Sequence, residues 1–227
     1  MGSLDMGRRD TKNLILDASE SLFSKNSYVN VTFRQIADLA GVHISQITYH
    51  FQNKDMLLKQ VVDRRSAELN KDRMNILRSY RRVVGEDNME IEPLIRAFLD
   101  PYFERLINDE DGTWRNFGAL IGRIVWDPQV LPTLNEAYND VAKHYLEALT
   151  KAAPDIDEEH IHRAFQFVLA AMYSAGADNR RIDTISDGKF SSNDFDRIYE
   201  LIIPFLTGGF EAIPRSPAVR QLHGDAA

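Results

Sequence analysis

The stretch 32–54 constrains the fold more than any other part of the chain, because its pattern predicts two short helices joined by a tight turn. In the first helix, apolar residues recur at spacings of three and four: Phe33, Ile36, Ala37 and Ala40. Thr32 stands just before them, where its hydroxyl can cap free N–H groups. Gly41 follows, and glycine tolerates the positive φ that a steep helix crossing requires. The stretch therefore predicts a helix-turn-helix.

The second helix of this stretch directs a set of hydrogen-bonding side chains outward: His43, Ser45, Gln46, Thr48, Tyr49 and His50. Short or planar polar groups of this kind reach base edges and phosphates from the major groove of DNA. An ordinary helical hairpin inside a bundle is the alternative. A helix that served only as core would not carry so many polar side chains beside two apolar anchors, Val42 and Ile47. The pattern favours DNA binding.

The rest of the chain repeats the helical apolar period and carries no strand signal, so we expect an all-α protein. The predicted helices cover residues 11–25, 53–84, 92–108, 114–126, 132–151, 157–178 and 193–213, with a polar loop over 179–192. We expect a three-helix, helix-turn-helix DNA-binding domain over residues 8–58, with the linking helix starting at about residue 53. A larger helical domain for ligand binding and dimerisation should follow over 59–213, with a flexible tail over 214–227.

The net charge of −7 is divided unevenly, with +2 on residues 1–65 and −9 on the remainder. This division suits a DNA-binding N-terminal domain, since phosphate binding needs local rather than global positive charge. Cysteine is absent, which excludes disulfides and zinc–thiolate sites. The chain has neither a long apolar run nor a hydrophobic signal region. We therefore expect a cytoplasmic protein without a membrane partner.

Sequence motifs for catalysis are missing, so we predict no enzyme, no catalytic residues, no metal site and no cofactor. His160 and His162 stand two positions apart, which directs them to different faces of a helix. The chain has no nucleophile elbow and no glycine-rich phosphate loop. The acidic cluster at 109–111 adjoins a glycine, as a solvated turn does.

Aromatic and polar residues on the middle helices suggest a mostly apolar pocket for a hydrophobic small-molecule effector. The candidate ligand-binding residues are Phe98, Tyr102, Phe117, Arg123, Trp126, Tyr145 and Tyr173. Plain core packing is the alternative for each of them. Arg123 lies in an apolar segment, and a buried guanidinium there would need an anionic partner. A ligand acid and the Glu104 carboxylate are the two candidates for that partner.

Residues 11–62 resemble the tetracycline-repressor (TetR) family of bacterial regulators. The resemblance rests on an apolar first helix followed by Val31-Thr32, Ile36-Ala37, Ala40-Gly41-Val42, Tyr49-His50-Phe51, Asn53-Lys54 and Leu57-Leu58. It implies a homodimeric repressor that binds a palindromic double-stranded DNA operator and is released by a small molecule. An activator, a regulator that responds to a protein partner and a helical enzyme are the alternatives.

The resemblance also implies which residues touch DNA. Thr32 and Arg34 would make contacts near the start of the first helix of the motif. Base-edge or nearby contacts would come from Ser45, Gln46 and Thr48, and phosphate contacts from Tyr49, His50 and Lys54. Two positions depart from the family pattern: His43 replaces the usual serine-like cap, and Thr48 replaces the usual tyrosine. Operator sequence therefore cannot be predicted.

Two further features bear on the larger domain. The segment 120–123 is similar to the fatty-acid-responsive branch of the family, which implies an acyl compound or another organic acid as effector. The segments 160–177 and 195–210 carry apolar residues on more than one face. Such segments form either a central core within a monomer or, as the resemblance implies, a four-helix interface between two protomers.

Overall fold

The computed structural model describes residues 2–215, with side chains described from residue 11 onward. Within this part of the chain all regular structure is helical, which confirms the all-α prediction. In chain order the helices are α1 (Gly2–Lys25), α2 (Phe33–Ala40), α3 (Ile44–Phe51), α4 (Lys54–Val84), α5 (Ile91–Ile107), α6 (Thr113–Ile124), α7 (Leu131–Ala152), α8 (Glu158–Gly176), α9 (Arg181–Ile185) and α10 (Phe195–Glu211). Short 3-10 turns lie at Tyr28–Asn30 and Glu86–Asn88.

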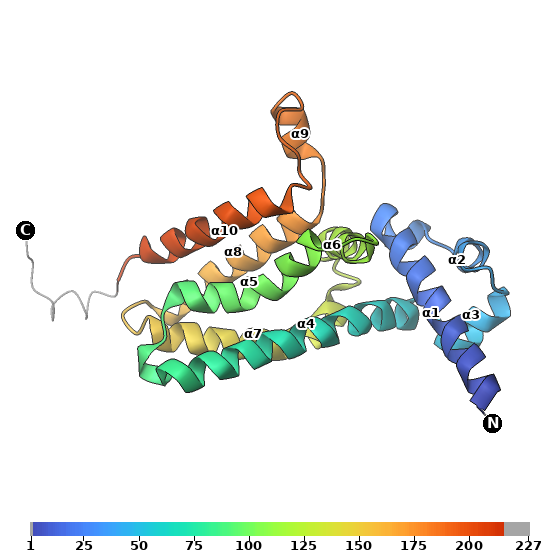
Figure 1. Cartoon of the computed structure of the whole chain (residues 1–227), viewed down its shortest axis with the longest axis horizontal. Coiled ribbons are helices and arrows are strands. Elements are labelled where there is room, and N and C mark those ends of the chain that lie inside the picture. The colour runs from blue at the N-terminus through green and yellow to red at the C-terminus, as the bar shows by residue number, and fades with distance from the viewer. Residues whose placement is uncertain (1, 216–227) are drawn as a thin grey trace, which may run out of the picture.

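The helices form two parts joined by α4 (Figure 1). Helices α1, α2 and α3 gather at one end, and α4 runs from them along the body formed by α5, α7, α8 and α10. Helix α6 lies between the two parts, and α9 projects from the body. Two predicted bounds were wrong: α1 begins at Gly2 rather than residue 11, and α9 forms within the segment predicted as a polar loop.

The helix-turn-helix forms from local interactions that the sequence predicted. The Thr32 hydroxyl accepts a hydrogen bond from the Gln35 N–H (3.3 Å), and the Gln35 side-chain oxygen accepts one from the Thr32 N–H (2.8 Å). This reciprocal pair caps two N–H groups at the start of α2. Gly41 adopts φ of +66°, a left-handed conformation that turns the chain from α2 into α3.

The described residues bury two hydrophobic clusters, one in each part. The cluster of the larger part joins α5, α7, α8 and α10 to the C-terminal half of α4. The cluster of the helix-turn-helix part also takes in residues from α6, the segment after it and the first turn of α7: Phe117, Leu120, Ile121, Ile124, Val130 and Leu134. Helix α6 therefore completes the core beneath the helix-turn-helix. The domain boundary predicted at residue 58 falls within α4 and stays a prediction.

Pro101 lies inside α5, where it deprives one backbone carbonyl of its helical donor. That carbonyl belongs to Ala97, and the Tyr145 hydroxyl lies 2.9 Å from its oxygen. The same hydroxyl lies 2.8 Å from the carbonyl oxygen of Arg73. Tyr145 is fully buried, so it fastens α7 to α4 and α5 from within the core.

Helices α6 and α8 cross closely because glycines face each other. A Cβ atom on Gly118 would lie 2.9 Å from the Gly176 carbonyl oxygen, and one on Gly122 would lie 2.5 Å from the Ala177 Cβ. Real side chains essentially never approach so closely, so only glycine fits at these positions. The crossing makes α6 and α8 a closely packed pair.

The predicted tail falls mostly outside the described residues. Arg215, the last of these, forms an ion pair with Asp155 (3.0 Å). Among the helices of the described residues, none combines the length and the hydropathy needed to span a bilayer.

Candidate DNA interface and ligand cavity

Helix α3 presents the predicted DNA-reading side chains at the surface. Ser45, Thr48 and Tyr49 are exposed, whereas Gln46 and His50 are half-buried. Ile47 and Phe51 anchor the opposite side of α3 in the core. The Gln46 side-chain oxygen accepts a hydrogen bond from the His43 N–H (2.9 Å), which leaves its NH₂ group to point outward. The Gln46 side chain thus caps the start of α3 in place of the His43 side chain.

The residues predicted on α2 are also at the surface. Thr32 and Arg34 are both exposed, and Thr32 caps the helix as described above. Arg34 forms no hydrogen bond or ion pair with any residue of the described chain. Among the described residues its guanidinium is therefore unpaired at the surface of α2.

Lys54 lies in a different environment from the one predicted for a phosphate ligand. Its ammonium donates to the carbonyl oxygens of Tyr28 (2.9 Å), Val29 (3.3 Å) and Val31 (3.1 Å). It also lies 4.5 Å from the centroid of the Tyr28 ring. An ammonium has three N–H donors. Lys54 thus fastens the loop before α2 to the start of α4, which explains a lysine at a helix N-terminus without any DNA phosphate.

The turn from α3 into α4 is strained at Gln52. Its backbone has φ of +58° and ψ of −56°, and the Asn53 N–H approaches the Phe51 carbonyl oxygen at 2.5 Å. These values describe a γ-turn with positive φ, a conformation that is rare for a residue with a side chain. The turn sets the angle between α3 and the long helix α4.

The larger part contains a cavity of about 160 Å³, partly open to the surface, between α4, α5, α7 and α8. Its lining is mostly apolar with a few polar groups, as expected of a small-molecule site. The lining residues are Arg73, Phe98, Val125, Leu131, Leu134, Asn135, Tyr138, Asn139, Ala142, Leu169, Met172 and Tyr173. No aspartate or glutamate is among them.

Of the seven predicted ligand residues, the structure brings only Phe98 and Tyr173 to this cavity. Tyr102, Phe117 and Tyr145 are buried in the core instead. The interpretation of Arg123 as a buried guanidinium was wrong: its side chain is exposed, and its Nε donates to the Ser24 carbonyl oxygen (2.6 Å) at the end of α1. Trp126 is 70% exposed and does not line the cavity.

Arg73 is the residue that the sequence reading missed. It is 1% exposed, and its guanidinium lies 3.9 Å from the centroid of the Phe98 ring. Burial lowers the pKa of this guanidinium from its ordinary value, and four nearby tyrosines oppose that shift. A signal was present, because Leu69 and Leu77 stand four residues to either side. That spacing puts Arg73 on the apolar face of α4.

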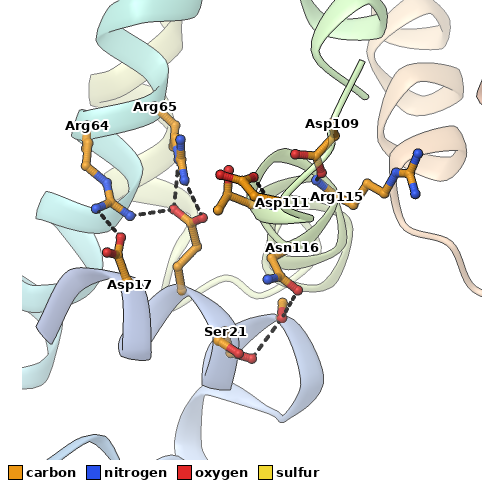
Figure 2. Close-up of polar contacts among 11 residues, drawn as sticks. Asp17, Ser21, Arg64, Arg65, Asp109, Asp111, Arg115 and Asn116 are labelled. Atoms are coloured by element: carbon orange, nitrogen blue, oxygen red, sulfur yellow. Dashed lines mark hydrogen bonds and ion pairs between the residues drawn. The ribbon is translucent and has the colours of Figure 1, made fainter. Parts of the chain in front are cut away.

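Charged side chains join α1 to α4 at the boundary between the two parts (Figure 2). Glu20 is 3% exposed and forms ion pairs with two arginines of α4. Arg65 binds both of its carboxylate oxygens (2.9 and 3.0 Å), and Arg64 binds Oε2 (3.0 Å) while also pairing with Asp17 (2.6 Å). The bidentate geometry fixes the orientation of α1 on α4.

Helix α6 meets the end of α1 at the same boundary. The Ser24 hydroxyl donates to the Asn116 side-chain oxygen (3.3 Å), and the Ser24 carbonyl accepts from Arg123. Helix α6 therefore contacts α1 on one side and, through its glycines, α8 on the other.

Helices α8 and α10 leave an apolar face at the surface. Phe167 is 66% exposed, Leu201 70% and Phe205 77%. A groove of about 570 Å³ runs between the two helices, lined by residues that are mostly apolar: His160, Arg163, Ala164, Phe167, Phe205, Leu206, Gly209, Phe210, Ile213 and Pro214. Exposed apolar surface of this extent marks an interaction site.

Comparison with known families gives two matches that together span most of the chain. Residues 15–61 match the family described as bacterial regulatory proteins, tetR family. Residues 65–209 match the tetracyclin repressor-like, C-terminal domain.

Two curated relatives are HTH-type transcriptional regulator TtgR and probable HTH-type transcriptional regulator ArpR, both from Pseudomonas putida. Each is 30% identical over 103 residues, which cover 44% of this chain and 45% of the relative. The chain thus spans about half the length of the curated relatives it matches.

Solved structures share the fold at low sequence identity. The fatty acid degradation regulator FadR from Bacillus halodurans has a TM-score of 0.58 at 16% identity, covering 85% of this chain and 94% of that one. FadR from Bacillus subtilis, solved in complex with stearoyl-CoA, has a TM-score of 0.54 at 15% identity, covering 84% and 97%. A tetR-family regulator from Shewanella sp. PV-4 has a TM-score of 0.55 at 17% identity, covering 86% and 96%.

Proposed function

Since the chain belongs to the TetR family of bacterial transcriptional regulators, we propose that it is a homodimeric repressor of the cytoplasm, where its DNA lies. It binds a palindromic operator and leaves it when a small hydrophobic effector enters the cavity of the larger part. The observation that carries this proposal is α3: polar side chains cover its exposed side while Ile47 and Phe51 hold its other side in the core.

DNA reading is divided between two kinds of side chain. Arg34, Tyr49 and His50 supply phosphate contacts, which position the protein on any duplex. Ser45, Gln46 and Thr48 lie along α3, where side chains reach base edges, and Thr32 lies at the start of α2 near the backbone of the duplex. Lys54 stays a candidate phosphate contact from the family pattern, although its hydrogen bonds to three carbonyls favour a structural role.

The first experiment selects fragments bound by the full chain from the genome of its source and then compares two variants on the recovered operator. Gln46→Glu keeps the oxygen that caps His43 but removes the outward NH₂ group, so it should lose operator preference while α3 stays folded. Arg34→Ala should weaken binding to operator and random DNA alike, and reduce the salt slope by about 1. If the two variants behave alike, the division of roles is wrong; if the chain binds no duplex at low salt, DNA binding itself fails.

The apolar face of α8 and α10 supports the homodimer. A single α3 contacts too few bases for useful specificity, whereas a two-fold axis places two such helices in successive major grooves. The projecting segment around α9 also exposes Ile185 (64%) and Phe190 (65%). These residues extend the apolar surface available to a second copy.

Sedimentation of the full chain tests the dimer. Phe205→Glu should convert a dimer into monomers, because it places a charge in the centre of the proposed interface. Phe205 is 77% exposed, so the protomer itself should stay folded. Val83→Glu is the matched control, since Val83 is 80% exposed at the far end of α4. A wild-type chain that sediments only as a monomer contradicts the proposal.

Release of DNA follows from the contacts of α6 and α4. A ligand shifts the spacing of the two α3 helices only if it binds one arrangement of the dimer more tightly than the other. Tyr173 on α8 lines the cavity, and its carbonyl packs against Gly122 of α6. Helix α6 in turn holds the end of α1, while Arg64 and Arg65 hold α1 to α4. Movement at the cavity wall thus reaches the DNA-binding part through closely packed helices.

The effector proposed from the sequence is an acyl compound or another organic acid. The likeness to FadR of Bacillus subtilis, solved with stearoyl-CoA, supports a hydrophobic effector of this class. Repression is tested by a reporter fused to the recovered operator in the presence and absence of the gene. Loss of the gene should raise expression, and a fall in expression would make the protein an activator.

A further inference from the structure

The cavity of the larger part contains a buried positive charge without a negative partner. Arg73 lines this cavity and forms no ion pair with any acidic residue of the described chain. A guanidinium stays charged in proteins, and an isolated buried charge is costly unless something compensates it. Arg73 therefore requires another explanation than an internal salt bridge.

The protein satisfies only part of the hydrogen-bonding capacity of Arg73. Its Nε donates to the Phe98 carbonyl oxygen (2.8 Å), and its Nη2 lies 3.3 Å from the Met172 sulfur, a weak acceptor. The Phe98 carbonyl lies within α5, where the helix already supplies a donor. Arg73 is thus not needed to satisfy that carbonyl, and the remaining guanidinium N–H groups have no acceptor among the described residues.

Two tyrosines that line the same cavity add further donors. Tyr138 on α7 and Tyr173 on α8 line the cavity, and neither hydroxyl has a hydrogen-bond partner in the described chain. Burial raises the pKa of both phenols above the ordinary value, so both keep their protons at neutral pH. The cavity therefore combines a guanidinium with two phenolic O–H groups and lacks any carboxylate.

We propose that this cavity binds a small amphipathic carboxylate, with the acid group on Arg73, Tyr138 and Tyr173 and the hydrocarbon part against Val125, Leu134 and Leu169. The guanidinium fork matches a carboxylate in geometry. A single arginine neutralises one negative charge, which suits a monocarboxylate better than a phosphate dianion. The volume of about 160 Å³ is close to the roughly 150 Å³ of a cavity that holds one benzene ring. This carboxylate would be the effector in the proposed function, and only its effect on DNA release rests on that function.

Matched pairs of ligands test the proposal on the wild-type full chain without DNA. Benzoate is compared with benzamide, and hexanoate with hexanamide, by thermal unfolding and titration calorimetry at neutral pH. At least one carboxylate should bind saturably and raise Tm, because a ligand of the folded state stabilises it. Its amide should bind at least about 30-fold more weakly, since it cannot compensate the buried charge. Equal binding of acid and amide, or no carboxylate binding at all, overturns the proposal.

Variants then locate the site. Arg73→Met keeps the apolar stem of the side chain, removes the guanidinium and should weaken carboxylate binding about 30-fold or more. Arg78→Met is the control, because Arg78 is exposed on the same helix and its loss changes the net charge equally. If Arg73→Met fails to fold, Tyr173→Phe provides the test. It removes one hydroxyl oxygen and should weaken binding of the carboxylate more than binding of its amide. Unchanged acid binding in the folded variants overturns the assignment. DNA binding does not enter these measurements, so their outcome is separate from that of the proposed function.

Discussion

Lys54 and Arg34 should respond in opposite ways when each is replaced by methionine. Both were predicted to contact DNA, but only Arg34 has a side chain without a partner among the described residues. The Lys54 ammonium makes three hydrogen bonds to carbonyl oxygens at 2.9 to 3.3 Å and lies over the Tyr28 ring. Methionine keeps the apolar stem of either residue and removes its charge.

The expected loss of stability follows from these contacts. A hydrogen bond to a charged group contributes about 1.5 to 3 kcal/mol when it is protected from water. Lys54 is half-buried, so each of these hydrogen bonds contributes about 1 kcal/mol to stability, and the cation–π contact adds roughly 0.5 kcal/mol. Lys54→Met should therefore lower the free energy of unfolding by about 3.5 kcal/mol. For a chain of this size that loss lowers Tm by about 7 to 14 °C.

Thermal and urea unfolding of the full chain measure this loss, and fluorescence anisotropy on random DNA at several salt concentrations measures phosphate binding. Arg34→Met should leave Tm within about 1 °C of wild type, as exposed substitutions do. It should also reduce the salt slope. If Lys54→Met leaves Tm unchanged and instead reduces the salt slope as Arg34→Met does, the structural role is refuted and Lys54 is a phosphate ligand.

Three further substitutions should change stability, as measured by thermal or urea unfolding. Gly176→Ala should cost about 2 kcal/mol or more, because its Cβ would lie 1.7 Å from the Tyr102 hydroxyl oxygen, and adding Tyr102→Phe should recover part of that loss. Gln52→Gly should gain about 1 kcal/mol by removing backbone strain at positive φ, and an unchanged or lower stability would contradict a strained turn. Glu20→Gln should cost about 2 kcal/mol or more, because two arginines of α4 lose a nearly buried counter-charge, and high salt should not restore the loss.

The sequence by itself determined the elements and the motif at the N-terminal end. Helix periodicity, the Thr32 cap and the Gly41 turn are interactions between residues at most a few positions apart, so they can be recognised along the chain. For the same reason the bounds of most helices agree with prediction to within a few residues. The exposed polar side of α3 was also predictable, because the apolar residues identify its buried face and the opposite face must then be exposed.

Only the tertiary structure decided which polar side chains inside or beside the core have partners. Arg123 lies in an apolar segment and Arg73 lies on an apolar helix face, yet Arg123 reaches the end of α1 at the surface while Arg73 lines the cavity. The family pattern assigned Lys54 to DNA, and the carbonyls that it binds could not be foreseen, since they come from a loop more than twenty positions earlier in the chain. The angular position of a residue on its own helix follows from the sequence. The partners that a side chain contacts depend instead on how distant helices cross. At α6 and α8 that crossing is set by glycines, which have no side chain.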